Sequence, residues 1–301
     1  MPFTLSHPAA VLPLLRRPFS AAALVAGAVA PDMPYFARST PVPVSAQSWY
    51  EPYLNATTSH GLLGAVTVSL PYALALWALY LVALRPVGSL LPSAAPRHPR
   101  PAGASALLRR GGWVLLSLLI GITTHLVWDS LTHSDGYVVL HVPFLGSPLA
   151  GDLTWARALQ HVSTLGGLLV IAVYLWRRRS RLLSAFGSAV PRTEQPAPTV
   201  PPNRTARTAL WVGLGVAAAG AVANTAEWWA GTGPRGGSGW SGSTGLPVRD
   251  MIETVLSASA TGAGAALVAT LLLYVAAWWT ARAVGALRRR SDRSTKERAQ
   301  P

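Results

Sequence analysis

Residues 111–133 have the sequence GGWVLLSLLIGITTHLVWDSLTH, an apolar run with ionisable side chains near its end. About 20 residues of α-helix cross the roughly 30 Å of hydrocarbon in a bilayer, so this run is long enough for one span. Its last third carries His125, Asp129 and His133, spaced four residues apart. Each step of four turns a helix by about 400°, which places the three side chains on nearly the same face. Because an ionisable group at membrane depth costs about 2.5–3.5 kcal/mol, this polar face is expected to turn towards a partner or a hydrated cavity.

Other apolar runs approach or exceed the length of one span. They are residues 61–84, 162–176, 209–229 and 254–281. A shorter run at 19–30 would rise only about 18 Å as a helix, which fits a re-entrant or interfacial segment. Hydrophobic residues make up 50% of the 301 residues and charged residues only 12%, against about 25% in a typical soluble chain. The sequence therefore predicts an all-α, polytopic integral membrane bundle with five to six membrane helices plus the short N-terminal helix.

Basic residues divide the loops into two sets. Loop 85–110 holds five, segment 177–208 seven and the tail from residue 282 seven, against one, one and two in loops 31–60, 132–158 and 231–250. Lys and Arg near span ends are retained in the cytoplasm, so the C-terminus is predicted to be cytoplasmic. The net charge of +14 is attributed to this orientation rather than to nucleic-acid binding. For the basic tail, attraction to anionic lipid is favoured over a nucleic-acid partner.

Composition also predicts the organisation of the chain. The expected segments are a membrane domain at 1–185, a Pro-rich cytoplasmic linker at 186–208, C-terminal membrane helices at 209–281 and a basic disordered tail at 282–301. A single lysine among 25 basic residues suggests a GC-rich bacterial genome, and hence the bacterial inner membrane. The N-terminus imitates a signal peptide that ends in Ala28-Val29-Ala30. We expect it to be retained, because His7 belongs to the polar set described next.

Most of the histidines avoid the basic loops. Six of the seven lie elsewhere: His7, His60, His125, His133, His141 and His161. In the predicted topology, Asp32 and His60 fall at or beyond the outer membrane surface, close to the end of the 111–133 helix. Neutral imidazoles and carboxylates suit zinc, manganese or iron, whereas the absence of cysteine excludes thiolate sites, disulfides and thiol nucleophiles. The alternative for any single intramembrane histidine is a hydrogen-bonded packing role.

Five stretches combine polar and small residues: MPFTLSHPAA at 1–10, GAVAPDMPYF at 27–36, SHGLLG at 59–64, the segment 124–133 and QHVS at 160–163. Together they resemble the motifs of the DUF4184 family of bacterial membrane proteins. The likeness covers about residues 1–175. That family is similar in turn to membrane-bound metal-dependent hydrolases of the YdjM type. The His-x3-Asp pattern also resembles that of zinc-dependent phospholipase C and the P1-type nucleases.

The resemblance implies a set of metal ligands. They are His7, Asp32, His60, His125, Asp129 and His133, with Gln160 and His161 as further candidates. The soluble enzymes supply a further His-x3-Glu pair and their terminal amine, and neither is recognisable here. Glu227 and Glu253 are candidate replacements. One or two metals are therefore expected rather than three.

A divalent metal with such ligands, zinc in the first place and manganese or iron otherwise, lowers the pKa of bound water to about 7. Phosphoester hydrolysis is its natural use, and lipid headgroups or lipid-linked phosphates are the substrates available at the outer surface of a bilayer. Neither a Gly-x-Ser-x-Gly elbow nor a Gly-x4-Gly-Lys-Ser/Thr loop occurs. The sequence thus predicts a membrane-bound metal-dependent hydrolase. The alternative is a non-enzymatic membrane protein, a transporter or a structural partner, whose inward His and Asp residues relay protons or bond one another.

Overall fold

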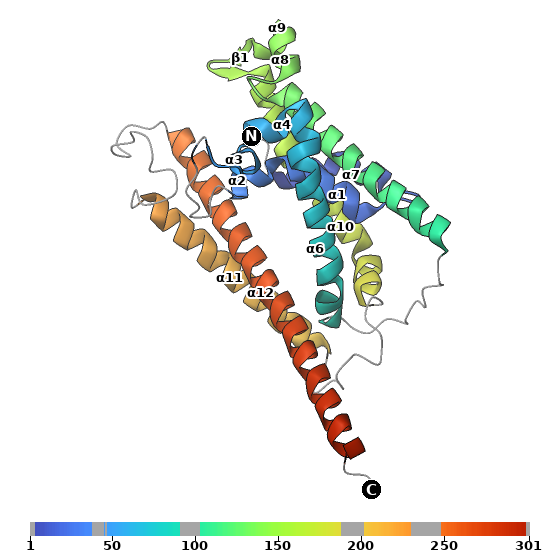
Figure 1. Ribbon diagram of the computed structural model, residues 1–301. Helices are drawn as coiled ribbons and strands as arrows, with labels where there is room; N and C mark the ends of the chain where they lie inside the picture. The colour runs from blue at the N-terminus through green and yellow to red at the C-terminus, as the bar shows by residue number, and fades with distance from the viewer. Residues whose placement is uncertain are drawn as a thin grey trace. The chain divides into compact units, whose positions relative to one another are not determined.

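The computed structural model describes residues 4–37, 45, 47–90, 103–187, 202–229 and 248–298, and it agrees with the predicted all-α class (Figure 1). The sheet found among these residues is a small antiparallel pair of β1 (Pro148–Ala150) and β2 (Leu153–Thr154). The chain divides into two units. The first comprises Met1–Leu81 with His98–Leu182, and the second comprises Val82–Arg97 with Leu183–Pro301.

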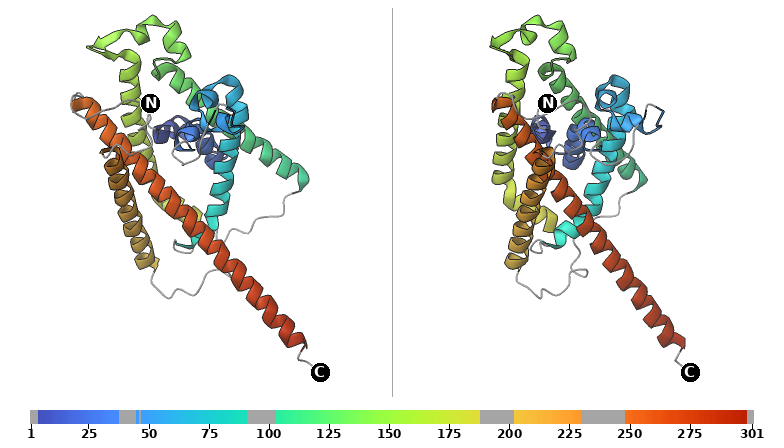
Figure 2. Two further views of the ribbon diagram at one scale, coloured as in Figure 1. Left: turned by 60° about the vertical axis from the view of Figure 1, so that its left-hand side comes forward. Right: turned by 90° about the vertical axis from the view of Figure 1, so that its left-hand side faces the viewer.

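Short helices at the N-terminus precede the long ones. They are η1 (Thr4–Leu14), α1 (Ala21–Val29), η2 (Ala30–Asp32), α2 (Met33–Ala37), α3 (Glu51–Leu54), α4 (Ala56–His60), α5 (Leu62–Gly64) and the π-helical turn η3 (Ala65–Ser69). The later helices are α6 (Leu70–Ser89), α7 (Ala104–Thr132), α8 (Tyr137–His141), α9 (Pro143–Gly146), α10 (Trp155–Gly187), α11 (Pro202–Trp229) and α12 (Val248–Arg298). Within the first unit, η1 and α1 lie between α7 and α10 in both turned views (Figure 2).

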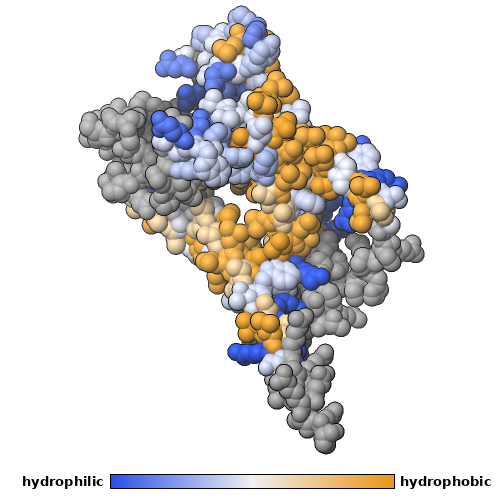
Figure 3. All heavy atoms as spheres, in the orientation of Figure 1, coloured by the Kyte–Doolittle hydropathy of each residue, from blue (hydrophilic) through white to orange (hydrophobic). Residues whose placement is uncertain are grey.

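Four helices in the described residues are long and apolar enough to cross a membrane. They are Leu62–Ser89, Ala104–Thr132, Trp155–Leu182 and Ala258–Arg289. Apolar side chains gather over the visible faces of α6 and α7, as a surface in contact with lipid requires (Figure 3). The run predicted at 209–229 falls in α11, where the apolar part is shorter, Trp211–Ala226. The N-terminal run is likewise part of a short apolar helix, Ala21–Phe36.

Helices α1 and α7 cross with their backbones in contact. A Cβ on Gly27 would overlap the carbonyl oxygen of Leu118, and a Cβ on Gly121 would overlap that of Leu24. Only glycine, which has no Cβ, allows helices to approach this closely. The fully buried side chains of Leu24 and Leu118 pack beside the crossing. This contact brings the end of α1 against the half of α7 that carries the predicted polar face.

A second close crossing joins α11 and α12 in the second unit. A Cβ on Gly220 would overlap the carbonyl oxygen of Gly262, so glycine is again required. One helical turn further on, Nδ2 of Asn224 donates a hydrogen bond to the Ala258 carbonyl at 2.7 Å. In the same unit, the hydroxyl of Tyr274 on α12 donates to the Pro86 carbonyl at 3.0 Å. Polar groups on these helices therefore find partners within the unit, as a low-dielectric environment demands.

Helix boundaries differ from those predicted in two places. Helix α12 continues to Arg298, although the sequence predicted a disordered tail from residue 282. Arg, Ala and Lys are strong helix formers, and a helix that has already begun gains one hydrogen bond for each residue added. Helix α10 extends to Gly187 and α11 begins at Pro202, so residues 188–201 of the predicted linker lie outside the described residues. Proline suits the first turn of α11, where its missing N–H is not needed.

Candidate metal centre

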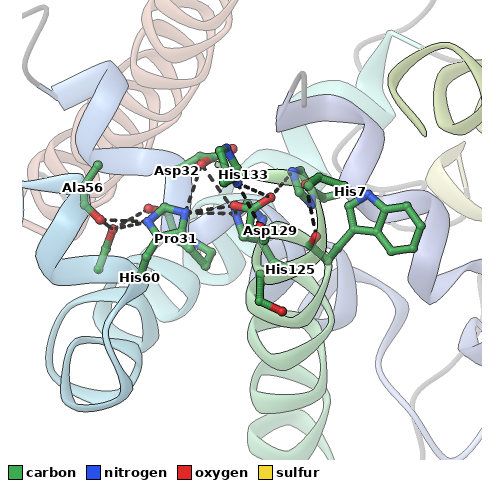
Figure 4. A network of polar contacts seen from close by, with 12 residues as sticks. His7, Pro31, Asp32, Ala56, His60, His125, Asp129 and His133 are labelled. Carbon is green, nitrogen blue, oxygen red and sulfur yellow. Dashed lines mark hydrogen bonds and ion pairs between the residues drawn. The ribbon is translucent and has the colours of Figure 1, made fainter. Parts of the chain in front are cut away.

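Four ionisable side chains from three segments meet in the first unit. They are Asp32 of η2, His60 of α4, and His125 and Asp129 of α7, and one ligand atom of each lies within 4.8 Å of all the others. Asp32, His125 and Asp129 are buried, whereas 22% of the His60 side chain is exposed. The four side chains point towards one another (Figure 4). This group could hold a metal ion, with one side open towards the surface.

Backbone carbonyls fix both imidazole rings of the group. Nδ1 of His125 donates to the Ala28 carbonyl at 2.7 Å, and Nδ1 of His60 donates to the Ala56 carbonyl at 2.8 Å. A neutral imidazole carries one proton, so each ring turns an unprotonated Nε2 towards the group. The two Nε2 atoms lie 3.3 Å apart. Two unprotonated nitrogens at this distance repel each other unless a proton or a metal ion lies between them, and carbonyl-fixed histidines are typical of metal sites.

Five of the six separations between ligand atoms match those of a tetrahedral site, and the sixth, between the carboxylate oxygens of Asp32 and Asp129, is within 4.8 Å. Nε2 of His60 lies 3.5 Å from Oδ1 of Asp32 and 3.2 Å from Oδ2 of Asp129. Nε2 of His125 lies 3.4 Å and 3.1 Å from the same two oxygen atoms. Ligands about 2.0–2.1 Å from zinc in tetrahedral geometry are separated by roughly 3.3 Å. The residues present therefore fit one ion held by two imidazoles and two carboxylates.

Hydrogen bonds hold α4 and its histidine in place. The hydroxyl of Ser59 donates to the Pro31 carbonyl at 2.6 Å, next to Asp32. The hydroxyl of Ser69, in the π-helical turn η3, donates to the Ser59 carbonyl at 2.8 Å. Sequence analysis did not identify Ser59, Ser69 or the carbonyl groups of Ala28 and Ala56. A backbone carbonyl carries no sequence signature, and the serines are only two of many in the chain.

The carboxylates and imidazoles of the group shift each other's pKa values, and the effect on the partly exposed His60 is the one that matters for metal binding. Burial alone raises the pKa of Asp32, but the imidazoles of His125 and His60 outweigh it and hold that pKa well below its usual range. Burial alone lowers the pKa of His60, but the carboxylates of Asp129 and Asp32 raise it to about 10. In the absence of an ion, His60 therefore carries an extra proton at neutral pH. A metal ion has to displace that proton.

We expect metal affinity to fall as the pH is lowered, because His60 has a pKa of about 10 and is protonated throughout the neutral range. Each displaced proton weakens apparent binding about tenfold per pH unit. Titration calorimetry of detergent-solubilised protein with Zn²⁺ at pH 6 and pH 8, in buffers of different ionisation enthalpy, measures both effects. An affinity that is equal at the two pH values, with no proton release, would contradict this assignment.

Two further predicted residues, His7 and His133, contact the group at one carboxylate oxygen of Asp129. Nε2 of His7 lies 3.5 Å from Oδ1 of Asp129, and Nδ1 of His133 lies 3.6 Å from the same oxygen. The His7 ring stacks on His125 with centroids 3.8 Å apart. Burial, together with the charge of His125, lowers the pKa of His7 to about 4, so its imidazole is neutral at pH 7. The structure thus brings all six principal candidates together.

The remaining candidates are placed differently. Gln160 and His161 lie on α10 and do not belong to the four-residue group that the described residues form. His141, on α8, is exposed, and its Nδ1 donates to the Tyr137 carbonyl at 2.7 Å. The side chains of Glu227 and Glu253 lie outside the described part of the chain.

An apolar groove of about 320 Å³ lies between α7 and the segment that begins at Leu62. Its lining residues are Leu62, Ala65 and Val66 on one wall and Leu119, Ile122, Thr123, Leu126 and Val127 on the other. Leu62 follows His60 by two residues, and Leu126 precedes Asp129 by less than one helical turn. Leu62 is 94% exposed and Val127 is 55% exposed, so the groove opens on the surface of the two candidate spans.

Comparison with known protein families shows which family the chain belongs to. A family model described as a domain of unknown function, DUF4184, matches residues 1–276. No curated protein and no solved structure matches the chain, so the comparisons give no support to the more distant likeness to YdjM-type hydrolases, phospholipase C or P1-type nucleases. The matched residues include the whole four-residue group and both histidines that border it. The chain belongs to the DUF4184 family, as its motifs predicted.

Proposed function

We propose that this protein is a membrane-bound metal-dependent hydrolase that acts on a phosphoester carried by a lipid. The observation that carries the proposal is the convergence of four ligand atoms at the spacing of a tetrahedral zinc site. Zinc is the preferred ion, with manganese and iron as alternatives, because the ligands are two imidazoles and two carboxylates. When bound, the ion would supply a positive charge for phosphoryl oxygens and, by accepting water as a fifth ligand beside the four side chains, a water of lowered pKa.

The residues of the group suit an anionic substrate. Two carboxylates balance the charge of one divalent ion, and the imidazoles are neutral when they act as ligands. The loaded site then carries no net negative charge that would repel a phosphate. His60 and His133 each expose 22% of their side chains, while Asp129 between them exposes only 6%. A substrate would therefore approach from the side of these two histidines.

The apolar groove supports a lipid as the carrier of the phosphate. Both of its walls belong to helices that are long and apolar enough to cross a membrane. Leu62 and Leu126 of the groove lie two and three residues from His60 and Asp129 in sequence, and we infer that a hydrocarbon chain between them carries its headgroup towards the group. Pockets of this kind combine apolar walls with a few polar groups that orient the ligand.

The membrane side follows from charge. Basic residues are concentrated in the loops after residues 85, 177 and 282, and we infer that these loops face the cytoplasm. The candidate metal centre then lies at the extracytoplasmic side of a bacterial inner membrane, with the C-terminus in the cytoplasm. Periplasmic or outer-leaflet phospholipids and lipid-linked phosphates are the substrates available there.

Metal content tests the proposal. We expect the detergent-purified protein to contain at least one zinc or manganese ion per chain by elemental analysis, and the double variant His125→Ala, Asp129→Ala to contain none. The control His141→Ala, whose side chain is exposed on α8, should keep the wild-type content. Phosphate release from lipid substrates in mixed micelles should follow the same order.

The alternative function predicts a different result. If the inward His and Asp residues only bond one another or relay protons, the purified protein stays folded without metal, and added Zn²⁺ neither binds at stoichiometric concentration nor stimulates phosphate release. That outcome would contradict the hydrolase and favour a non-enzymatic membrane protein.

A further inference from the structure

Asp129 has a second carboxylate oxygen that the four-residue group does not use. Its Oδ2 faces the Nε2 atoms of His60 and His125. Its Oδ1 is buried and has no hydrogen-bond partner among the described residues. A buried polar atom without a partner destabilises the fold, and such atoms in folded proteins call for an explanation, which is often a bound ion or water.

His7 lies on that other side of Asp129. Its Nε2 is 3.5 Å from Oδ1, and within the described part of the chain this nitrogen, too, is buried and has no hydrogen-bond partner. Only 5% of His7 is exposed. In Figure 4, His7 and His60 lie on opposite sides of Asp129, so the two rings address different oxygen atoms of one carboxylate.

The surroundings hold the His7 ring in this position. It stacks on His125 with an interplanar angle of 22°, which prevents the ring from turning away. A neutral imidazole is the form in which histidine binds metals. Oδ1 of Asp32 lies 3.4 Å from Nε2 of His125, the ring on which His7 stacks. The His133 ring borders the same Oδ1 at 3.6 Å.

We propose that Asp129 bridges two metal ions. The four-residue group holds the first through Oδ2, and Nε2 of His7 with Oδ1 of Asp129 holds the second, with Asp32 and His133 beside it. Carboxylate-bridged ions in two-metal hydrolases lie about 3.5–4 Å apart, a spacing that one bridging aspartate spans. Two divalent ions exceed the charge of two carboxylates by about two units, which favours a doubly anionic phosphate monoester over a neutral ester. This inference rests on the first metal site of the proposed function.

The test counts ions in the full-length protein in detergent. Wild type, His7→Phe and His141→Phe are loaded with Zn²⁺, freed of excess by gel filtration and measured by elemental analysis. Phenylalanine keeps the ring that stacks on His125 but lacks a ligand atom, and His141 is an exposed control. We expect two ions in wild type, one in His7→Phe and two in His141→Phe. Electron paramagnetic resonance of the Mn²⁺-loaded forms should show spin-coupled ions in wild type and an isolated ion in His7→Phe.

The remaining outcomes contradict either the second ion, the bridging role of Asp129 or the proposed function. One ion in both wild type and His7→Phe, with no spin coupling, overturns the second ion and leaves the first site intact. Loss of both ions in a His7→Phe variant of wild-type helix content shows that His7 only supports the first site, which also overturns the bridge. No ion in wild type overturns the proposed function itself. If His7→Phe does not fold, the ion count and the spin coupling of wild type still decide the question.

Discussion

A valine in place of Gly121 is expected to separate α1 from α7 and to abolish the metal centre with it. A Cβ at this position would overlap the Leu24 carbonyl oxygen and would lie 2.7 Å from the backbone nitrogen of Ala28. Both are backbone atoms, so no side chain can rotate away to make room. Overpacking of a rigid core costs about 1–3 kcal/mol, and a clash with several backbone atoms of α1 should exceed that range. The Ala28 carbonyl that orients His125 would move with α1.

Thermal unfolding followed by circular dichroism, together with elemental analysis, measures both consequences. Gly112→Val is the matched control, because it lies on the same helix and a Cβ there meets nothing within 4 Å. We expect the control to melt close to wild type and to keep its metal. Equal melting temperatures and metal contents for Gly121→Val and wild type would show that the crossing is not needed.

Asp129→Asn is expected to remove all measurable metal binding while leaving the helices intact. Asn has almost the shape of Asp but no charge, and one of its two terminal atoms is a hydrogen-bond donor. Asp129 lies 3.1–3.5 Å from three imidazole nitrogens, those of His125, His60 and His7. Even the loss of a residue that only orients a ligand costs about 10–100-fold in affinity, so the loss of this shared ligand should exceed 100-fold.

Zinc titration of Asp129→Asn beside Asp135→Asn separates this effect from a general change of charge. Asp135 is exposed just beyond the end of α7, so its variant has the same net charge without touching the group. We expect wild-type affinity in Asp135→Asn. Retention of tight binding in Asp129→Asn would contradict both the four-ligand site and the bridge.

The parts of the fold that follow from local composition were predictable from sequence. A helix that crosses a bilayer needs about 20 apolar residues, and the runs at 61–84, 111–131, 162–176 and 254–281 all fall within helices long enough to span. The i, i+4 spacing also gave the shared face of His125 and Asp129, because it depends only on the pitch of one helix. Helix ends were less predictable, as α12 shows by continuing through its basic segment to Arg298.

The assembly of the site was harder to predict, because it depends on contacts between distant segments. Asp32 and His60 join α7 across 97 and 69 residues of sequence from Asp129; the predicted topology placed them at the same membrane surface, and the resemblance to a family named them as ligands. The carbonyls of Ala28 and Ala56 orient the rings, yet every residue has a carbonyl. Gly27 and Gly121 allow the approach of the two helices, but their partnership appears only when both backbones are in place.

The burial of the segment around Ala30 has a consequence for the maturation of the protein. The stretch Ala28-Val29-Ala30 has the small residues that a signal peptidase accepts, but Ala28, Ala30 and Asp32 are all fully buried. Proteases cut chains that are exposed and extended. Once α1 has docked, this peptide is therefore shielded, and a cut made earlier would detach the imidazole of His7 and the carbonyl of Ala28 from the rest of the centre. The proposed metal centre therefore requires that the first thirty residues stay attached to the chain.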